Sequence, residues 1–387
     1  MRARHFFTRL HILVLLGVAM MHAHAATPEY RVTVLAPPGS SASAINQAGV
    51  VVGSYVARSG AAGAFLNRGK GMVPLGRIGV SSGPAAINDK GQVLGNWVTD
   101  GGQRRGVIWY RGHTRDIGIV PGTPGGYHTA INNAGYSVVQ APVDGITRSY
   151  LRAPDGSYRD IGNLPAMPPT TNAEGLNNRN QITGGSGEFS LPEIQFRAFT
   201  WTRGTMRDLG DIGSMPNVGN DINDRGQVTG FASLPAAFPD RLAFIHTRGR
   251  LQVIDGRPAS VSPYSEGWRI NNRGHVIGFS DHLFGFVYRG RRMEALNALV
   301  DPAAGWSLTP NDINDAGQIA ATGYRGGQQF AVRLDLIRPA IEAAPEPDTE
   351  ADADASQPDF LLTPAQAAEE ARLDAEAEAR EAVQPMQ

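Results

Sequence analysis

The 387-residue chain holds 47 glycines, 26 prolines and no cysteine, and its 35 Lys and Arg nearly balance 36 Asp and Glu. Without cysteine it cannot form disulfides, thiolate metal sites or a lipid-bearing cysteine. Residues 26–338 carry 30 basic and 23 acidic residues, whereas residues 339–387 carry 2 and 13. The surplus of seven positive charges over residues 26–338 is too thinly spread to predict nucleic-acid binding, which requires a clustered basic stripe.

The first 25 residues have the pattern of an export signal. Three arginines form a basic region, residues 12–21 form an apolar core, and residues 23–25 (Ala-His-Ala) provide a small-x-small cleavage site. Ten apolar residues are too few to span a bilayer, which needs about 20. We therefore predict a signal peptide at 1–25, no membrane span, and a mature chain in the periplasm or outside the cell.

One short phrase then recurs seven times: an apolar residue, Asn, a polar pair and usually Gly, followed by a β-rich run, as in AINDKGQVLG at 86–95. A period of 42 to 48 residues is typical of stacked or radial repeat architectures. The repeated asparagines are Asn46, Asn88, Asn132, Asn177, Asn223, Asn271 and Asn314.

Each repeat contains four short β-type segments. In the second repeat these are residues 84–88, 92–98, 106–111 and 114–118, joined in pairs by compact Gly-containing turns. Two hairpins per repeat, with this period, predict a four-stranded propeller blade.

The two ends of the repeat region are complementary. Residues 30–36 resemble a fourth segment, whereas the last repeat stops at its third segment, residues 329–337. We therefore predict an all-β, seven-bladed β-propeller over 26–338 that is closed by the N-terminal strand, which removes two open sheet edges. We expect a monomer.

The acidic Ala/Glu/Pro-rich tail, residues 339–387, has too few large apolar residues to fold by itself. Thr363-Pro364 and Gln366 have the pattern of a helix start, so residues 364–382 are expected to be partly helical. One alternative is that the tail folds over the basic repeat domain; the other is a solvated interaction tail.

Three motifs recur in the repeats: Ile-Asn-x-x-Gly-Gln-Val-x-Gly, Asp-Leu-Gly or Asp-Ile-Gly at segment ends, and Ala-Phe pairs such as residues 64–65. Over about residues 30–335 they resemble the HAF-type extracellular repeat family. The His of that family's His-Ala-Phe triplet is replaced here by Gly63, Arg197 and Leu242. The resemblance implies an exported bacterial repeat protein with propeller-like blades, and it brings no established reaction.

Turn lengths divide the expected propeller into two faces. The short first-to-second and third-to-fourth turns share one face, and the longer, heterogeneous connections share the other. Loops on a rigid scaffold often carry binding residues, and aromatic and arginine side chains are enriched in binding hot spots. The alternative is that these side chains pack under their own loops. We predict a ligand-binding face that comprises Trp97, Arg104, Arg105, Tyr127, Tyr264, Trp268, Trp306 and Tyr324.

The Asn-Asp-x-Gly turns superficially resemble a calcium loop, but no acid follows them at constant spacing. We therefore expect the asparagines to cap their own turns and predict no metal site. The histidines lack zinc-site spacing and no GxSxG motif is present, so we predict no cofactor.

Carboxylates near the axis keep an enzymatic alternative open. Asp221 and Asp312 are the acids expected on the inner strands, next to Arg269, and Glu174 and Glu266 are expected at the channel mouth. A propeller glycoside hydrolase or lyase requires two such groups to converge, whereas a solvated polar ring does not. The sequence favours an exported, non-catalytic scaffold that binds a glycan or protein of the envelope or extracellular space.

Overall fold

The computed structural model describes residues 28–337, except 58–59, 61, 77, 166, 191–192, 213, 235–239 and 257–263. The predicted signal peptide and the predicted acidic tail lie outside the described residues. Within the described part, no helix has the length and apolar character needed to cross a membrane.

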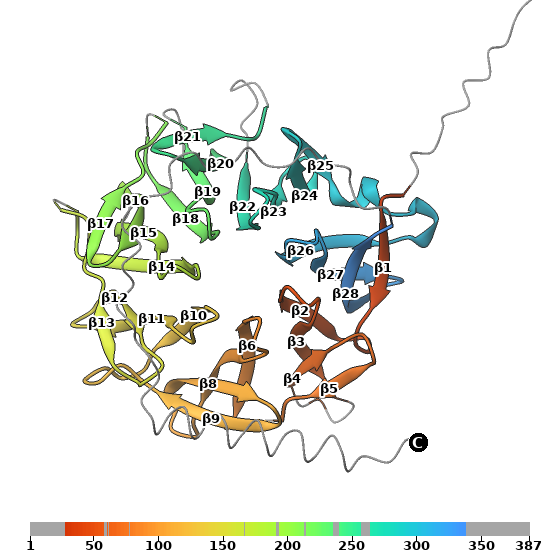
Figure 1. Ribbon diagram of the computed structural model, residues 1–387, viewed down its shortest axis with the longest axis horizontal. Coiled ribbons are helices and arrows are strands. Elements are labelled where there is room, and N and C mark those ends of the chain that lie inside the picture. Colours follow the sequence, from red (N-terminus) through yellow and green to blue (C-terminus); the bar gives the residue numbers. More distant parts are fainter. Residues whose placement is uncertain are drawn as a thin grey trace, which may run out of the picture.

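The strands form seven four-stranded antiparallel sheets arranged as blades around a central axis, so the seven-bladed β-propeller is confirmed (Figure 1). The first strand of each repeat lies nearest the axis and the fourth lies outermost (Figure 1). From the inside outward, the blades are β2 (Ser40–Ile45), β3 (Val51–Val56), β4 (Ala62–Asn67) and β5 (Met72–Pro74); β6 (Ser81–Ile87), β7 (Val93–Val98), β8 (Arg104–Tyr110) and β9 (His113–Gly118); β10 (Tyr127–Ile131), β11 (Ser137–Val143), β12 (Ile146–Arg152) and β13 (Tyr158–Asp160); β14 (Thr170–Leu176), β15 (Ile182–Ser190), β16 (Glu193–Thr202) and β17 (Thr205–Asp208); β18 (Asn217–Ile222), β19 (Val228–Ser233), β20 (Arg241–Thr247) and β21 (Arg250–Val253); β22 (Ser265–Ile270), β23 (Val276–Ser280), β24 (Phe284–Arg289) and β25 (Arg292–Ala295); and β26 (Ser307–Ile313), β27 (Ile319–Arg325), β28 (Gln328–Leu336) and β1 (Tyr30–Val34).

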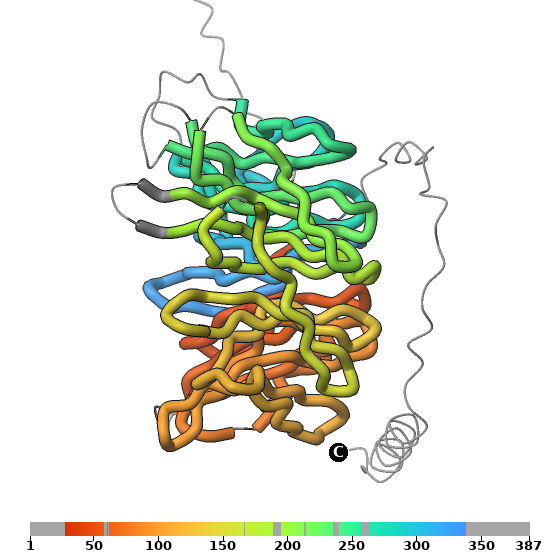
Figure 2. The backbone as a smooth tube through the Cα atoms, turned by 90° about the vertical axis from the view of Figure 1, so that its left-hand side faces the viewer, coloured from red at the N-terminus to blue at the C-terminus, as the bar shows by residue number. Residues whose placement is uncertain are grey.

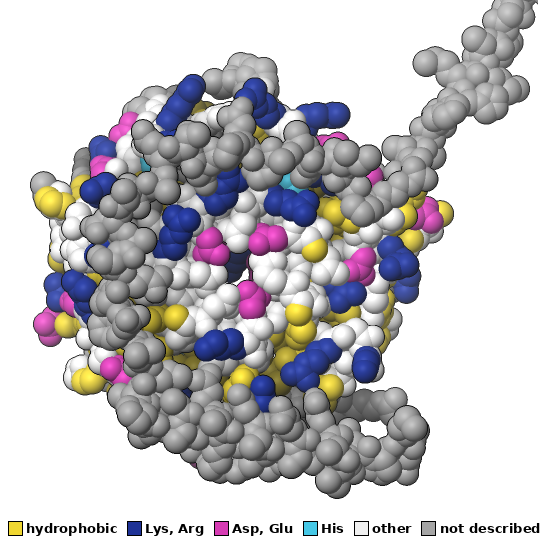
Figure 3. Space-filling model, in the orientation of Figure 1, with side chains coloured by type: hydrophobic (Ala, Val, Ile, Leu, Met, Phe, Trp, Pro, Cys, Tyr) yellow, Lys and Arg dark blue, Asp and Glu magenta, His cyan; other side chains and the backbone are white. Residues whose placement is uncertain are grey.

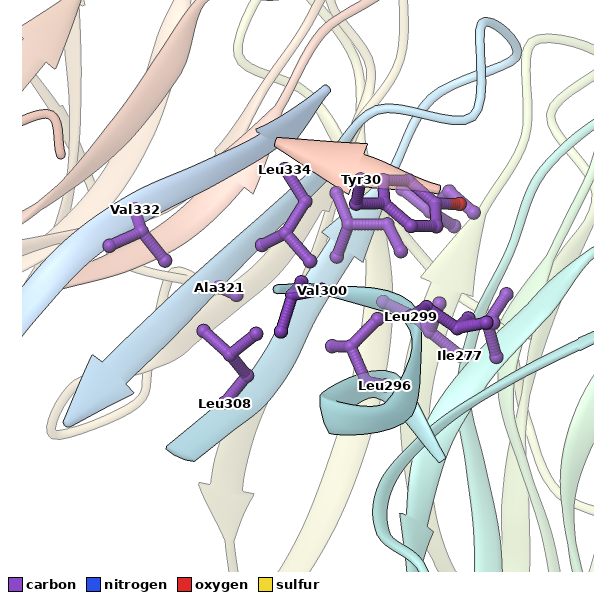
Figure 4. Packing of buried hydrophobic residues seen from close by; sticks show 12 residues of the cluster. Tyr30, Ile277, Leu296, Leu299, Val300, Leu308, Ala321, Val332 and Leu334 are labelled. Atoms are coloured by element: carbon purple, nitrogen blue, oxygen red, sulfur yellow. The ribbon is translucent and has the colours of Figure 1, made fainter. Parts of the chain in front are cut away.

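The N-terminal strand closes the ring as predicted. Strand β1 pairs antiparallel with β28, from Tyr30 opposite Leu336 to Val34 opposite Val332. Two short 3-10 helices, η1 (Leu296–Leu299) and η2 (Pro302–Ala304), connect the sixth blade to the seventh. Helix η1 inserts its leucines into the apolar cluster that also buries Tyr30 (Figure 4). The closing strand is therefore held by packing as well as by its backbone ladder.

The Gly that ends five of the seven copies of the repeated phrase is explained by steric contact. In every blade a β-bulge interrupts the pairing of the first and second strands, three residues before the repeated Asn. Beside the bulge, the first strand comes so close that a Cβ on Gly53 would lie 2.1 Å from the Ser41 carbonyl oxygen. Only glycine permits this approach without a backbone shift, and the same holds at Gly230 against Val218.

The repeated asparagines are buried and cap their own turns. Each side-chain oxygen accepts a hydrogen bond from the backbone N–H four residues later, at 2.9 to 3.0 Å. Each turn ends on a residue with positive φ, which is Gly in six copies and Asn180 (φ 57°) in the fourth. The predicted turn-capping role is confirmed.

The same asparagines also link the blades. Each side-chain N–H donates to the backbone carbonyl of the corresponding Asn in the next blade, at 2.8 to 3.2 Å, and the last donates to the first. A second closed ring runs through the following residue, whose backbone N–H donates to its counterpart's side-chain oxygen at 2.7 to 2.9 Å. Two circular hydrogen-bond rings thus join all seven blades on one side of the molecule.

The two faces are named after their connections. The tight-turn face carries the asparagine turns, and the long-loop face carries the second-to-third and fourth-to-first connections. In the side view of Figure 2 the long-loop face lies at the left, where hairpins of unequal length project. This division follows from strand order alone, because successive antiparallel strands turn at opposite ends.

Candidate functional site

The eight residues predicted to bind a ligand form three groups on the long-loop side. The first group joins the second and third blades and contains Trp97, Arg104, Arg105 and Tyr127. The second group lies on the fifth and sixth blades, and the third lies on the seventh.

In the first group, two neighbouring arginines have different partners. The Arg105 guanidinium forms an ion pair with Asp116 at 2.8 Å and lies 5.9 Å from the Trp97 ring centroid. The Arg104 guanidinium lies 5.4 Å from the Tyr127 ring centroid, and no carboxylate among the described residues pairs with it. Both arginines belong to strand β8, which begins two residues earlier than the sequence suggested. Alternation along this strand points the two side chains to opposite faces of the sheet.

Arg104 and Tyr127 line an open recess of about 360 Å³ between the second and third blades. Gln140, Pro142 and Thr147 contribute from strands β11 and β12. The loop before β10 contributes Pro124 and two glycines to the lining. A volume of this size lies within the ordinary range for small-ligand sites.

The backbone next to Tyr127 is hydrogen-bonded to the second blade. The Asn96 side chain holds the His128 backbone through two hydrogen bonds, N–H to Oδ1 at 2.7 Å and Nδ2 to the carbonyl at 2.9 Å. His128 itself is fully buried, and a Cβ on Gly106 would lie only 2.4 Å from its Nε2. Burial, assisted by the Arg152 guanidinium, lowers the pKa of His128 from 6.5 to about 3. His128 is therefore a neutral packing residue at neutral pH.

The second group surrounds Arg241 on the fifth and sixth blades. The Arg241 guanidinium lies 4.4 Å from the Phe231 ring centroid and 4.3 Å from that of Tyr264, and it forms an ion pair with Glu266. Trp268 donates its indole N–H to Glu266 at 3.1 Å and stacks on Phe279.

In the third group, the Arg325 guanidinium lies 4.2 Å from the Trp306 ring centroid, and Tyr324 donates its hydroxyl to Gln329 at 3.1 Å. Trp306 packs edge-on against Phe330. Both Trp268 and Trp306 therefore pack within their own blades, as the alternative interpretation of these aromatic residues proposed.

The central channel contains an acid–base–acid row on three consecutive blades. Asp221, Arg269 and Asp312 occupy the same position of the inner strand, two residues before the repeated Asn. Burial raises the pKa of Asp312 from 3.8 to about 6 and also raises that of Asp221, while the charge of Arg269 lowers both. The prediction that these two are the inner-strand acids is wrong, because Glu174 lies in β14 and Glu266 in β22.

Both channel aspartates bind backbone groups of the neighbouring blade. Asp221 accepts the Ile270 N–H at 2.9 Å, and Asp312 accepts the Ile45 N–H at 2.9 Å. Asp312 also accepts its neighbour Ile313 N–H at 2.8 Å. These carboxylates thus reinforce the contacts between the fifth and sixth blades and between the seventh and first.

Acidic side chains surround the opening of the tight-turn face (Figure 3). The second hydrogen-bond ring supplies Asp89, Asp224 and Asp315, which line a cavity of about 150 Å³ together with the asparagine turns. Within the part of the chain that the structure describes, no three His, Asp or Glu side chains are grouped so that they could hold a metal ion.

Sequence reasoning missed two features of the site. The first is that Gln140, Pro142 and Thr147 line the recess, although no sequence motif marks them. They reach it because the third blade packs beside Arg104 of the second blade. The Arg241 cluster was also missed, although its aromatic neighbours Tyr264 and Trp268 were selected. The loop at 121–128 was the available signal for the recess, since it combines prolines, glycines and an exposed tyrosine.

Comparison with solved structures agrees with the fold. The β-propeller domain of the Trilobed protease from Pyrococcus furiosus is similar over 76% of this chain and 95% of its own, with a TM-score of 0.53 and 8% identity. A catalytically inactive virginiamycin B lyase from Staphylococcus aureus, solved with quinupristin, is similar over 80% of this chain and 100% of its own, with a TM-score of 0.51 and 12% identity. No protein-family model matches the sequence, and no curated protein sequence does. At these identities the similarity shows the β-propeller fold alone.

Proposed function

We propose that the chain is an exported, non-catalytic binding scaffold of the HAF type that engages an envelope or extracellular glycan or protein through its long-loop face. The observation that supports it most is the open recess of about 360 Å³ beside Arg104 and Tyr127. A concave site with few polar groups on a rigid frame is the usual form of a ligand site.

The channel chemistry supports a binding role over a catalytic one. Asp221 and Asp312 have the raised pKa values that a general acid requires. Each nevertheless directs an oxygen at a backbone N–H of the next blade. A carboxylate that is hydrogen-bonded in this way stabilises the packing of the blades. This role favours the binding scaffold, and a propeller glycoside hydrolase or lyase is the second candidate.

A binding assay on envelope material tests the first candidate. The mature chain, residues 26–387, is incubated with immobilised cell-wall, outer-membrane and secreted-polymer fractions. We expect retention on one fraction, and loss of retention when Arg104→Gln is combined with Tyr127→Ala. The matched control combines Arg179→Gln with Arg225→Gln on the tight-turn face and should bind like the parent. Absence of retention on every fraction, or equal loss in the control, contradicts the proposal.

A turnover assay tests the second candidate. The parent chain is incubated with polysaccharides from the same fractions, and released reducing ends and unsaturated products are measured. Turnover that disappears in a folded Asp312→Asn variant would establish the hydrolase or lyase and displace the binding scaffold.

A further inference from the structure

The arginines of the long-loop face differ in whether a carboxylate pairs with them, and this difference indicates the charge of the ligand. Arg105 is paired with Asp116, and Arg241 is paired with Glu266. Arg104 instead rests against the Tyr127 ring, with no carboxylate partner among the described residues. Arg104 is exposed, and the planar N–H fork of a guanidinium matches a carboxylate through two hydrogen bonds.

The lining of the recess contains no acid that would repel an anion. Its polar groups other than Arg104 are neutral, from Gln140 and Thr147. Gln140 already donates its Nε2 to the Ala173 carbonyl at 2.8 Å and to Glu174 at 3.0 Å. These bonds hold the Gln140 amide on the fourth blade, so Arg104 and Thr147 are the polar side chains of the lining that remain for a ligand.

The apolar part of the lining favours a sugar over a peptide side chain. Tyr127 is 44% exposed and is the large hydrophobic side chain of the recess, and the rest is proline, alanine and glycine. A peptide anchor normally needs a deep apolar pocket, whereas a sugar ring needs an aromatic edge or face and hydrogen-bond partners for its hydroxyls. The hydrogen bonds from Asn96 fix the backbone of His128 beside Tyr127, which limits the entropic cost of ordering the site.

We infer that this recess binds an acidic saccharide, with the carboxylate of a uronic acid on Arg104, the sugar ring against Tyr127, and a ring hydroxyl on Thr147. The inference rests on the proposed function and specifies its ligand class. The charge of Arg104 supplies selectivity for the acid, because a neutral sugar leaves the guanidinium without a partner.

The test uses an array of trigalacturonate, alginate trimer and hyaluronan tetramer, each printed as the free acid and as its methyl ester. Calorimetry on the mature chain then follows any positive sugar. We expect the free acid to bind at least tenfold more tightly than its ester, and Arg104→Gln to remove that preference. Arg104→Lys should retain part of it. The matched control is Arg179→Gln, which removes an exposed arginine from the tight-turn face and should change affinity less than twofold.

Three outcomes overturn the inference. Equal binding of acid and ester contradicts the role of Arg104 while leaving the scaffold in place. Binding to envelope fractions without binding to any acidic sugar excludes the ligand class alone. Tighter binding of hexaglutamate, or of a peptide covering residues 342–359 of the acidic tail, would assign the recess to an acidic polypeptide. Failure of the envelope assay itself would instead count against the proposed function.

Discussion

The two faces of this propeller are built from the same strands but follow different rules. On the tight-turn face every blade makes the same bonds, since seven buried asparagines cap seven turns and link them in a ring. On the long-loop face the arginines differ in what they contact: Asp116 for Arg105, Glu266 for Arg241 and the Tyr127 ring for Arg104. The same side chains recur where each blade hydrogen-bonds to the next one. They differ between blades where no such hydrogen bonds are made.

The difference separates stability from recognition. Substituting one asparagine of the buried hydrogen-bond ring should strongly lower the free energy of unfolding, because several buried backbone groups then lose their partners. Exposed stacked and ion-paired side chains contribute little to the free energy of unfolding. The following predictions test this separation, from the largest expected effect to the smallest.

Removing one ring asparagine should cause the largest loss of stability. Asn177 accepts the Arg179 and Gln181 N–H groups and donates to the Asn223 carbonyl. Asn177→Ala should lower the free energy of unfolding by about 3–4 kcal/mol, because buried partners stay unsatisfied. Urea denaturation measures it, with the adjacent exposed Asn178→Ala as the control, which should cost about 1 kcal/mol. Equal losses in the two variants would refute a special role for the buried ring.

The channel aspartate should make stability fall as the pH rises. Because the folded pKa of Asp312 is about 6, above its usual 3.8, the folded chain takes up the proton more readily than the unfolded chain. This contribution is present below about pH 3.8 and is lost as the pH rises through 6, at a cost on the order of 2–3 kcal/mol. Asp312→Asn should flatten the profile between pH 4 and 7 in urea titrations. An unchanged slope would show that Asp312 titrates normally.

Buried His128 should act in the opposite direction. Its folded pKa of about 3 lies below its usual 6.5, so the unfolded chain binds the proton more readily and stability falls as the pH drops below 6.5. Between pH 7 and 5 this loss amounts to about 2 kcal/mol. Unfolding of His128→Leu at the two pH values should lack this loss. A double variant, His128→Leu with Asp312→Asn, should show the smallest change of unfolding free energy with pH. If the single and the double variant both still lose stability between pH 7 and 5, other groups cause that loss.

The smallest effect on stability belongs to the recess. Arg104→Gln should change the free energy of unfolding by less than about 0.5 kcal/mol, since Arg104 is exposed and has no carboxylate partner among the described residues. Thermal unfolding of the parent and the variant measures this directly. A clear drop in the midpoint would show that the Arg104–Tyr127 stack maintains the fold, and the functional contrast between the faces would then disappear.

Local pattern was enough to predict the blade. The Asn-x-x-Gly turns, the strand lengths and the missing fourth strand of the last repeat led to seven blades closed by residues 30–36, and the structure closes them with β1 at Tyr30–Val34. The turns are local, because a turn and its cap involve residues at most four positions apart, whereas the closure followed from counting the segments of each type. The same reasoning placed Arg104 and Arg105 in a connection, whereas they lie in strand β8.

By itself, the sequence determined the number of blades, the turn chemistry and the division into two faces, since each depends on short-range spacing and strand alternation. Only the tertiary structure decided that the asparagines form a closed ring, that Asp221 and Asp312 bind the neighbouring blades, and that Arg104 shares a recess with Gln140 and Thr147. The physical reason is that these contacts join residues from different repeats. Their distances follow from how the blades pack around the axis.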